Sequence, residues 1–221
     1  MIVSPESIAF TAPQGFLVLE GVNGAGKTTL QSRIIDHLSA AGRKTVRTRE
    51  PGSTRLGEQI RGILLSGAER PCPRSELLLF AADRAEHVEK TIRPALAAGS
   101  FVISDRYLYS TTAFQGYGRE LDLGMVDTIN RTAIDGLEPD FVILLDLDAA
   151  EGLRRSAKRG DAAEDAFEAE ALAFHERLRR GFLKIAAESK TPFIVLDATG
   201  TPEQIFAQLR EPLNRWMAGR R

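Results

Sequence analysis

The segment Gly21–Thr28 constrains the fold of this 221-residue chain more than any other feature. Its sequence, GVNGAGKT, matches the phosphate-binding pattern G-x-x-x-x-G-K-[ST] at every fixed position. The apolar run FLVLE (16–20) precedes it, and the amphipathic stretch TLQSRIIDHL (29–38) follows it. Glycines let backbone N–H groups turn toward phosphate oxygens, and the start of the following helix adds its positive end. The segment therefore predicts a P-loop that binds a nucleotide.

Residues of the P-loop have expected roles. Lys27 should reach the β- and γ-phosphates and take part in catalysis, and Thr28 should place its hydroxyl on Mg²⁺. The residues expected to bind ATP are Gly21, Asn23, Gly24, Ala25, Gly26, Lys27, Thr28 and Thr29. The loop does not define the reaction, because GTPases, ATPases and nucleotide kinases share it. A GTPase is disfavoured, since the chain has no N-K-x-D segment and its D-x-x-G match, Asp197–Gly200, follows the last predicted strand.

Short apolar runs alternate with longer amphipathic stretches along the chain. Strands are predicted at 16–20, 45–48, 101–105, 141–146 and 193–196. Helices are predicted at about 26–41, 55–66, 74–98, 122–136, 149–159, 165–188 and 201–217. Several of the runs are apolar on both faces, as strands of a parallel sheet covered by helices must be. The alternation predicts an α/β fold with a five-stranded parallel sheet and helices on both faces.

The composition favours a globular protein that acts on small molecules. The chain has 29 Lys and Arg against 30 Asp and Glu, so its net charge of −1 gives no sign of a nucleic-acid-binding face. Its single cysteine, Cys72, cannot form an internal disulfide and is typical of a cytoplasmic protein. No apolar run approaches the roughly 18 residues of a membrane span. We expect one domain over 15–221, preceded by an irregular extension over 1–14.

Four segments beyond the P-loop resemble bacterial thymidylate kinases. They are TREPGST (48–54) with LGEQIR (56–61), LFAADR (79–84), DRYLYS (105–110) running on to AFQGYGR (113–119), and a basic lid with DAFE (165–168). Their order and spacing match that family over roughly residues 15–210. The resemblance implies the fold of P-loop nucleoside monophosphate kinases. It also implies in-line transfer of the γ-phosphate of ATP to dTMP with Mg²⁺.

Arginines that follow the second strand are candidates for binding the phosphate of the acceptor. Arg49 and Glu50 come where this strand ends, at the carboxyl edge at which such sheets bind ligands. The resemblance implies that Arg49 and Arg61 hold the 5′-phosphate of dTMP and that Glu50 faces its sugar and the metal. An acceptor phosphate must approach another polyphosphate, so neutralising cations are required. From the residues alone, Arg61 could also be a surface arginine packed along its helix.

The predicted helix over 74–98 carries candidates for binding the base. Phe80 and Arg84 are four residues apart and share one helix face. Phe80 also ends the apolar stripe LLLF, so a place in the core is the alternative. The resemblance implies that Phe80 stacks on thymine, that Arg84 donates to its O4, and that Thr111 and Gln115 contact the base edge. It places the ring of Phe114, usually a tyrosine in the family, under the deoxyribose, where no 2′-hydroxyl fits.

Asp105 ends the strand FVISD and Arg106 follows it. A carboxylate at the end of this strand lies near the phosphates and Mg²⁺ in P-loop proteins, so Asp105 is a candidate catalytic and metal-binding residue with Thr28. The resemblance implies that Arg106 reaches the acceptor phosphate and the transferred group. An Asp–Arg pair that only orders a turn is the alternative.

The lid, at about 154–168, contains the basic residues Arg154, Arg155, Lys158 and Arg159. The P-loop has no arginine, and the resemblance implies that the family then keeps a catalytic cation in the lid. Arg155 and Arg159, one helical turn apart, are the expected catalytic pair, although one of them could stack on adenine instead. A solvated surface loop is the alternative for this charged stretch.

Two positions depart from the family's pattern and leave alternatives open. Asn23 stands where an acidic residue is common, and Ala166 where an arginine is often found. A kinase for another pyrimidine deoxynucleoside monophosphate, or a P-loop nucleotide-binding protein with little turnover, therefore stays possible. The arginines at 49, 61, 84 and 106 argue against the second, because a protein that binds only ATP needs no acceptor pocket. The resemblance also implies a homodimer.

Overall fold

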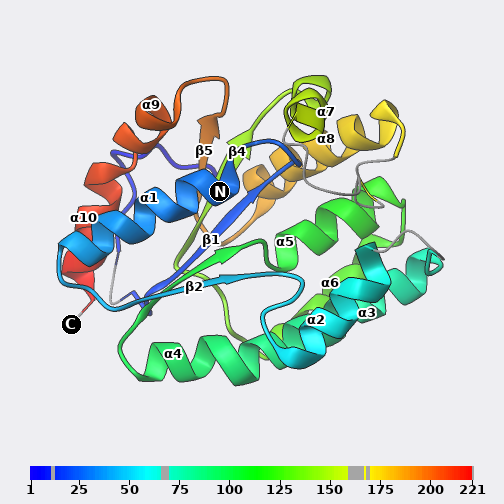
Figure 1. Cartoon of the computed structure of the whole chain (residues 1–221), viewed down its shortest axis with the longest axis horizontal. Helices are drawn as coiled ribbons and strands as arrows, with labels where there is room; N and C mark the ends of the chain where they lie inside the picture. The colour runs from blue at the N-terminus through cyan, green and yellow to red at the C-terminus, as the bar shows by residue number, and fades with distance from the viewer. Residues whose placement is uncertain (11–12, 66–69, 159–166, 168–169, 221) are drawn as a thin grey trace.

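The computed structural model describes residues 1–10, 13–65, 70–158, 167 and 170–220. A sheet of five parallel strands in the order β2-β3-β1-β4-β5 lies at its centre (Figure 1). The strands are β1 (Phe16–Gly21), β2 (Thr45–Arg49), β3 (Phe101–Asp105), β4 (Phe141–Asp146) and β5 (Phe193–Asp197). All five predicted strands are present, and the parallel α/β architecture is confirmed.

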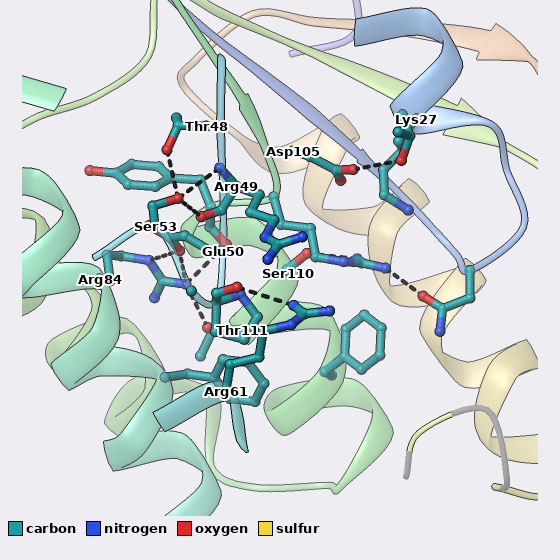
Figure 2. Close-up of a pocket in the computed structure, with 18 of the residues that line it drawn as sticks. Lys27, Thr48, Arg49, Glu50, Ser53, Arg61, Arg84, Asp105, Ser110 and Thr111 are labelled. Carbon is teal, nitrogen blue, oxygen red and sulfur yellow. Dashed lines mark hydrogen bonds and ion pairs between the residues drawn. The ribbon is translucent and has the colours of Figure 1, made fainter. Parts of the chain in front are cut away.

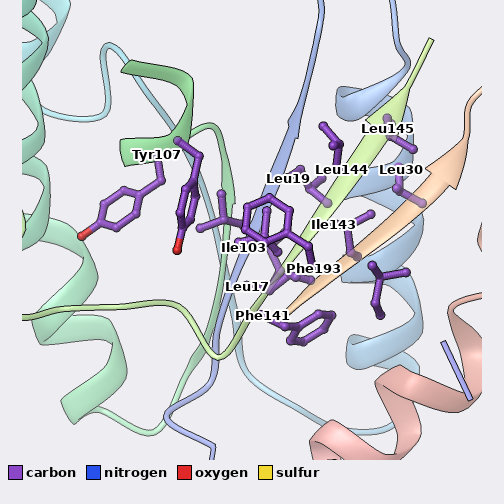
Figure 3. Close-up of a cluster of buried hydrophobic side chains, with 14 of the residues drawn as sticks. Leu17, Leu19, Leu30, Ile103, Tyr107, Phe141, Ile143, Leu144, Leu145 and Phe193 are labelled. Carbon is purple, nitrogen blue, oxygen red and sulfur yellow. The ribbon is translucent and has the colours of Figure 1, made fainter. Parts of the chain in front are cut away.

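Apolar side chains on both faces of the central strands form the core. Leu17 and Leu19 of β1 lie in one buried cluster with Ile103 of β3 and Ile143 of β4 (Figure 3). Every residue of β1 is buried, since β3 and β4 flank it. Glu20 is the charged residue of this strand, and a carboxylate in such a place needs hydrogen-bond donors around it.

Helices cover both faces of the sheet. On one face, α1 (Lys27–Ala40) contacts α9 (Pro202–Ala207), and on the other, α8 (Leu172–Glu188) contacts β1, β4 and β5 (Figure 1). The other α-helices in the described ranges are α2 (Arg55–Leu65), α3 (Pro73–His87), α4 (Arg93–Ala97), α5 (Leu108–Thr111), α6 (Leu123–Ile134), α7 (Ala149–Lys158) and α10 (Arg210–Gly219). Two π-helical segments are η1 (Val88–Ile92) and η2 (Thr112–Gly118).

Some helices differ from those expected. The helix predicted over 74–98 is interrupted by the wider π-turn η1, and the helix predicted over 201–217 divides into α9 and α10. The prediction over 165–188 is wrong at its start, because α8 begins at Leu172; most of 165–169 lies outside the described residues. No helix is predicted over 108–118, where the structure has α5 and η2. This segment contacts α6 and α8, so tertiary packing and not an apolar period gives it helical form.

A capping box begins α9. The Thr201 hydroxyl accepts a hydrogen bond from the N–H of Gln204 (3.2 Å), and the Gln204 side chain accepts one from the N–H of Thr201 (2.9 Å). Both bonds satisfy N–H groups that an α-helix leaves unpaired at its start. Pro202 at the first helical position needs no such partner, so this boundary was readable from the sequence.

Two contacts attach the chain ends to the sheet. The carboxylate of Asp140 accepts hydrogen bonds from the N–H groups of Gln14, Gly15 and Phe16 and from Nε1 of Trp216. One half-buried side chain thus fixes both the start of β1 and the last helix. The first residues are not wholly irregular, because Ile2 forms a parallel bridge beside β5.

The carboxyl ends of the parallel strands meet at one edge of the sheet. The register places Asp105, the last residue of β3, opposite Leu19 of β1 and Arg49 of β2. The P-loop leaves β1 at the same edge. The chain from β1 to β2 crosses to one side and the chain from β3 to β4 to the other, so this edge includes the switch point at which such sheets bind ligands.

Candidate active site

A cavity of about 660 Å³ opens at this edge of the sheet (Figure 2). Its walls come from the P-loop, from the segments after β2 and β3, and from α2, α3 and η2. The expected site residues that line it are Asn23, Gly24, Gly26, Lys27, Thr28, Arg49, Glu50, Arg61, Phe80, Arg84, Asp105, Arg106, Thr111, Phe114 and Gln115. The expected ATP-binding and acceptor-binding sets therefore share one cavity. The expected ATP contacts Gly21, Ala25 and Thr29 belong to the P-loop and the start of α1 but do not line it.

Glycines shape the P-loop. Gly24 and Gly26 have φ angles of 78° and 96°, which other residues rarely adopt. A Cβ atom on Gly24 would lie 2.1 Å from the carbonyl oxygen of Gly152, so only glycine fits between the loop and α7. Gly26 immediately precedes α1 and has no side chain to cap it, so the first N–H groups of α1 are left for an anion.

Lys27 lies back across the P-loop. Its Nζ donates to the carbonyl oxygens of Gly21 (3.1 Å) and Val22 (3.0 Å), and the residue is buried. These contacts hold an ammonium group beside the N–H groups that the loop presents. The loop thus combines a fixed positive charge with backbone donors, as phosphate binding requires.

Thr28 and Asp105 form a pair of oxygen ligands beside the P-loop. The Thr28 hydroxyl donates to Oδ2 of Asp105 at 3.4 Å. Oδ1 of Asp105 is buried and has no hydrogen-bond partner within the described part of the chain. That part contains no cluster of three or more Asp, Glu, His or Cys able to hold a metal by itself. A hydroxyl and a carboxylate with an oxygen to spare fit Mg²⁺, which takes its other ligands from phosphates and water.

Arg106 joins the P-loop to the part of the cavity lined by the residues expected to bind the acceptor. Its Nη2 donates to Oδ1 of Asn23 (2.6 Å), and its Nη1 donates to the Gly21 carbonyl (3.2 Å) and the Ser110 hydroxyl (2.9 Å). Its guanidinium carbon lies 5.0 Å from the centre of the Phe114 ring. The backbone of Arg106 is left-handed, with φ of 76°, a strained conformation for a residue with a side chain.

Glu20 lies beneath this segment. Its Oε1 accepts hydrogen bonds from the N–H groups of Tyr107 and Ser110 (3.0 Å each), and its Oε2 accepts one from the Ser110 hydroxyl (2.6 Å). Burial raises the pKa of Glu20 to about 7, although the nearby charge of Arg106 and the hydrogen bonds oppose this rise. The Glu20 carboxylate is thus fully buried and hydrogen-bonded to Tyr107 and Ser110, in the segment that follows β3.

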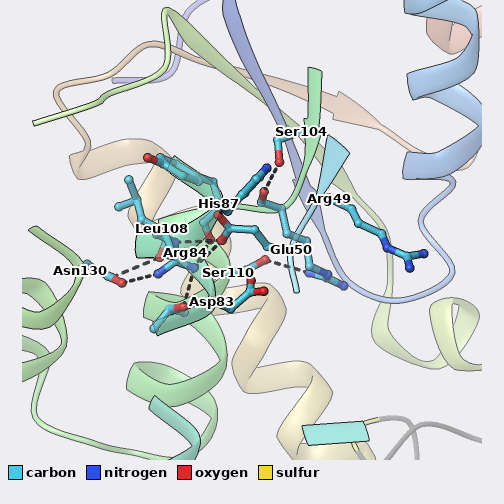
Figure 4. Close-up of polar contacts among 12 residues, drawn as sticks. Arg49, Glu50, Asp83, Arg84, His87, Ser104, Leu108, Ser110 and Asn130 are labelled. Atoms are coloured by element: carbon cyan, nitrogen blue, oxygen red, sulfur yellow. Dashed lines mark hydrogen bonds and ion pairs between the residues drawn. The ribbon is translucent and has the colours of Figure 1, made fainter. Parts of the chain in front are cut away.

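Arg84 lies at the centre of a buried polar network (Figure 4). Its Nε donates to Oε2 of Glu50 (2.9 Å) and its Nη1 to Oδ1 of Asn130 (2.8 Å). Its Nη2 donates to the Thr111 hydroxyl (2.9 Å) and to the Tyr107 carbonyl (3.1 Å). These partners fix the plane of the guanidinium at the cavity wall, as a group that reads a base edge must be fixed.

Glu50 bridges Arg84 and a histidine. Its Oε1 lies 2.9 Å from Nδ1 of His87, and Nε2 of His87 lies 2.6 Å from the Thr48 hydroxyl. Glu50 is buried and lines the cavity, and its carboxylate is directed to Arg84 and His87. His87 is fully buried and therefore supports two residues of the cavity wall from behind, a role that its position in a predicted helix does not reveal.

Asp83 attaches the segment after β2 to α3. Its Oδ1 accepts a hydrogen bond from the N–H of Gly52 (3.0 Å), and Oδ2 is buried with no partner in the described structure. Burial, and then the charge of Glu50, raise the pKa of Asp83 to about 6.

Three aromatic rings enclose the far end of the cavity. The ring of Phe167 lies 6.0 Å from that of Phe80 and 5.4 Å from that of Phe114, centre to centre. Phe80 is only half-buried and lines the cavity, so it is available as an apolar platform although it also packs against the core. Phe167 belongs to the expected lid and was not among the predicted site residues.

Gln115 and Thr111 lie on η2 and α5, and both are buried. Nε2 of Gln115 donates to Oε1 of Glu76 (2.7 Å), and this carboxylate also accepts from Arg119. The wider turn of η2 brings Gln115 and Phe114 to the cavity together, and π-helical turns are frequent at functional sites.

Two arginines stand at the mouth of the acceptor side. Nη2 of the exposed Arg49 donates to Oε1 of Glu58 at 3.1 Å, and Nη1 of Arg61 donates to the Pro51 carbonyl at 3.1 Å. Both arginines line the cavity.

Arg155, the one of the two expected lid arginines that the structure describes, does not line the cavity. Nε of Arg155 donates to Oε1 of Glu151 (2.7 Å), and its Nη1 donates to the carbonyl of Ala198 (2.9 Å), after β5. Hydrogen bonds from Arg154 and then Arg155 lower the pKa of Glu151 to about 2. Arg159 lies outside the described residues, as does Ala166.

The sequence model of the thymidylate kinase family matches residues 19–209. The chain belongs to the thymidylate kinase family. Among curated relatives, the thymidylate kinase of Solidesulfovibrio magneticus is 47% identical over 196 residues, covering 86% of this chain and 94% of the relative. That of Oleidesulfovibrio alaskensis is 45% identical, covering 88% and 95%, and that of Cereibacter sphaeroides is 45% identical, covering 92% and 95%.

In this member of the thymidylate kinase family, several residues in or behind the cavity wall escape prediction from sequence. Ser110 and Phe167 line the cavity, and Glu20, His87 and Asn130 are buried behind its wall and bind residues that line it. Glu20 did give a signal, because a carboxylate at the end of an otherwise apolar, central strand must have partners. Asn130 and His87 give none, since their partners lie tens of residues away in the sequence.

Proposed function

We propose that the chain transfers the γ-phosphate of ATP to dTMP in the cavity at the sheet edge, using the residues named below. Membership of the thymidylate kinase family makes the chain an ATP-dependent phosphotransferase acting on dTMP. The observation that carries the assignment of residues is Arg106, whose guanidinium contacts both the P-loop and the ring of Phe114. A protein that only binds ATP would not need this connection to a second pocket.

The acceptor side has separate groups for phosphate, sugar and base. Arg49, Arg61 and Arg106 neutralise the 5′-phosphate of dTMP, and Phe114 lies against its deoxyribose. Phe80 stacks on thymine, while Arg84, Thr111 and Gln115 contact its polar edge; Glu50 holds Arg84 and faces the sugar. The buried hydrogen bonds of Arg84 support this division, because they keep a donor in one plane before the base arrives.

The donor side comprises the P-loop and the ligands of a metal ion. Residues 21 and 23–29 surround the phosphates of ATP, with Lys27 at the β- and γ-phosphates. Thr28 and Asp105 hold Mg²⁺, which neutralises phosphate charge when bound. The unpartnered Oδ1 of Asp105 supports this role.

The reaction needs positioning and charge stabilisation more than acid–base chemistry. The attacking atom is an anionic phosphate oxygen of dTMP, so no strong general base is required. Lys27 and Arg106 hold donor and acceptor in line and stabilise charge on the group in transit. Arg106 is suited to this because it is held between the two halves of the site.

We further propose that the lid, about 154–168, supplies catalytic cations through Arg155 and Arg159. Arg155 contacts the segment after β5 and would have to leave the Ala198 carbonyl to reach the phosphates, whereas from its present place it could lie against the adenine. This lid belongs to a single domain over 15–221 that follows a short extension, 1–14.

The proposal extends to the assembly and setting of the protein. Exposed Leu56 and Ile63 of α2 and Leu78 of α3 support a homodimer that packs these adjoining helices across a two-fold axis.

A net charge of −1 supports small anionic substrates and not nucleic acid as partners. We place the enzyme in the cytoplasm, where ATP and dTMP are available. None of the helices in the described ranges is long and apolar enough to cross a membrane.

Steady-state ADP release with Mg·ATP tests the substrate. The panel comprises dTMP, dUMP, dCMP, UMP and AMP, and Lys27→Met serves as the control for contaminating kinases. We expect dTMP to have the highest kcat/KM and Lys27→Met to lose activity. A preference for another base would overturn the dTMP assignment, and release of ADP that is independent of any acceptor would overturn the kinase assignment.

A further inference from the structure

Glu20 is unusual for a residue of a central strand. It is fully buried at the end of β1, one residue before the P-loop begins. All three hydrogen bonds given to its carboxylate come from Tyr107 and Ser110, almost ninety residues further along the chain. None of these donors belongs to a substrate-binding group proposed above, so the carboxylate acts on the segment that follows β3.

That segment begins with the strained residue Arg106. Its φ of 76° lies in the left-handed region, which surrounding contacts must enforce. The N–H of Arg106 donates to the Leu19 carbonyl (2.9 Å), and the N–H of Tyr107 donates to Glu20 (3.0 Å). Consecutive residues of β1 thus fix consecutive residues around the strained turn.

Ser110 extends this control to the arginine side chain. Its hydroxyl hydrogen is used by Oε2 of Glu20 at 2.6 Å, so its oxygen lone pairs are left for Nη1 of Arg106 at 2.9 Å. The Gly21 carbonyl and Oδ1 of Asn23 take the other contacts of the guanidinium. Glu20 therefore governs both the backbone and the side-chain orientation of Arg106.

We propose that Glu20, acting directly and through Ser110, is a positioning residue that places Arg106 for phosphoryl transfer. The inference rests on the proposed role of Arg106. An arginine that stabilises a group in transit must keep its place to a fraction of an ångström, because small displacements cost large factors in rate. Glu20 also fixes the P-loop end of β1, so one carboxylate aligns the donor and acceptor sides.

The test separates positioning from simple structural support. Glu20→Gln and Ser110→Ala are made in the wild-type chain and in Arg106→Lys, and kcat, KM for dTMP and Kd for ATP are measured. Thr132→Ala removes an exposed hydroxyl of α6 that does not line the cavity, and serves as the matched control. Melting temperatures are recorded for every variant.

We expect Glu20→Gln and Ser110→Ala to lower kcat about tenfold or more, with Kd for ATP within about twofold of the wild type. In Arg106→Lys, the same substitutions should lower kcat by less than about threefold, because the group they position is already gone. Thr132→Ala should leave all constants unchanged.

Equal losses of kcat in both backgrounds would overturn the inference, as would a lowered melting temperature with unchanged kcat. If Glu20→Gln fails to fold, Ser110→Ala alone decides by its kcat and its coupling to Arg106. If Arg106→Lys has no measurable turnover, the split between kcat and Kd for ATP decides. A wild-type chain inactive on dTMP would contradict the proposed function, whereas active but uncoupled variants would contradict only the role of Glu20.

Discussion

Oδ1 of Asn23 accepts a hydrogen bond from Nη2 of Arg106 at 2.6 Å, so the P-loop is joined directly to the arginine proposed to bind the acceptor phosphate. In the sequence, Asn23 departs from the pattern of the thymidylate kinase family, in which an acidic residue is common at this position. The structure gives the asparagine oxygen a defined partner. Position 23 therefore orients Arg106 without placing a negative charge next to the phosphates.

Removing the side-chain oxygen of Asn23 should slow turnover more than it weakens ATP binding. We expect Asn23→Ala to lower kcat roughly fivefold, since a hydrogen bond to a charged group at a partly exposed site contributes about 1 kcal/mol. Kd for ATP should change little, because backbone N–H groups and Lys27 hold the phosphates. Asn23→Asp keeps an acceptor oxygen and should retain wild-type kcat. A loss in Asn23→Asp as large as in Asn23→Ala would argue that Arg106 does not depend on this contact.

The network around Arg84 should dominate the stability of the acceptor side. Arg84→Met removes the guanidinium that pairs with the buried carboxylate of Glu50 and leaves that carboxylate its hydrogen bond with His87. We expect the free energy of unfolding to fall by about 3–5 kcal/mol, as when one member of a buried ion pair is removed. Denaturant titration measures this change. Arg131→Met breaks the exposed pair with Asp127 on α6 and should cost less than about 1 kcal/mol.

The ring of Phe114 should discriminate against ribonucleotides. Phe114→Val leaves space beside the sugar, so we expect the ratio of kcat/KM for dUMP over UMP to fall about tenfold, within the 1–3 kcal/mol typical of steric selection. These substrates differ only in the 2′-hydroxyl, so general effects on Arg106 cancel in the ratio. Phe114→Tyr keeps the wall and should keep the ratio. An unchanged ratio in Phe114→Val would show that another group excludes the hydroxyl.

The buried Glu20 should make stability depend on pH. Its pKa is about 7 in the folded chain against an ordinary value of 4.5, so between these values the folded chain holds a proton that the unfolded chain has released. Raising the pH through this window therefore removes stability, and above pH 7 the loss is complete. Relative to the wild type, Glu20→Gln should gain roughly 2–3 kcal/mol of unfolding free energy from pH 5 to pH 8. Denaturant titrations at pH 5 and pH 8 measure the unfolding free energies of both proteins. If the difference between the two proteins is the same at both pH values, the pKa of Glu20 is not raised by burial.

Much of the fold could be predicted because its signals are local. The P-loop pattern, five apolar runs and the capping box at Thr201 each lie within a few consecutive residues. The segment 108–118 could not be predicted as helical, because LYSTTAFQGYG has no apolar period and folds against α6 and α8. Single long helices at 74–98 and 201–217 were expected because periodicity does not reveal a π-turn or a short break.

The residues of the candidate site also divide into those that could be predicted from the sequence and those that could not. Residues such as Arg84 and Arg106 could be named because they stand in motifs, whereas the groups that hold them could not. Glu20 and Ser110 are joined across 90 residues, and Asn130 reaches Arg84 from α6, so only the folded chain brings them together. From the sequence, Phe80 could be either a core residue of the stripe LLLF or a platform for the base. In the structure it is half-buried and lines the cavity, which favours the platform.

Transfer of labelled phosphate tests the central claim most directly. The chain is incubated with dTMP, Mg²⁺ and ATP labelled in its γ-phosphate, and the products are separated by chromatography. We predict that the label appears in dTDP, with one dTDP formed for each ADP. Label released as inorganic phosphate, with ADP formed but no dTDP, would contradict the account.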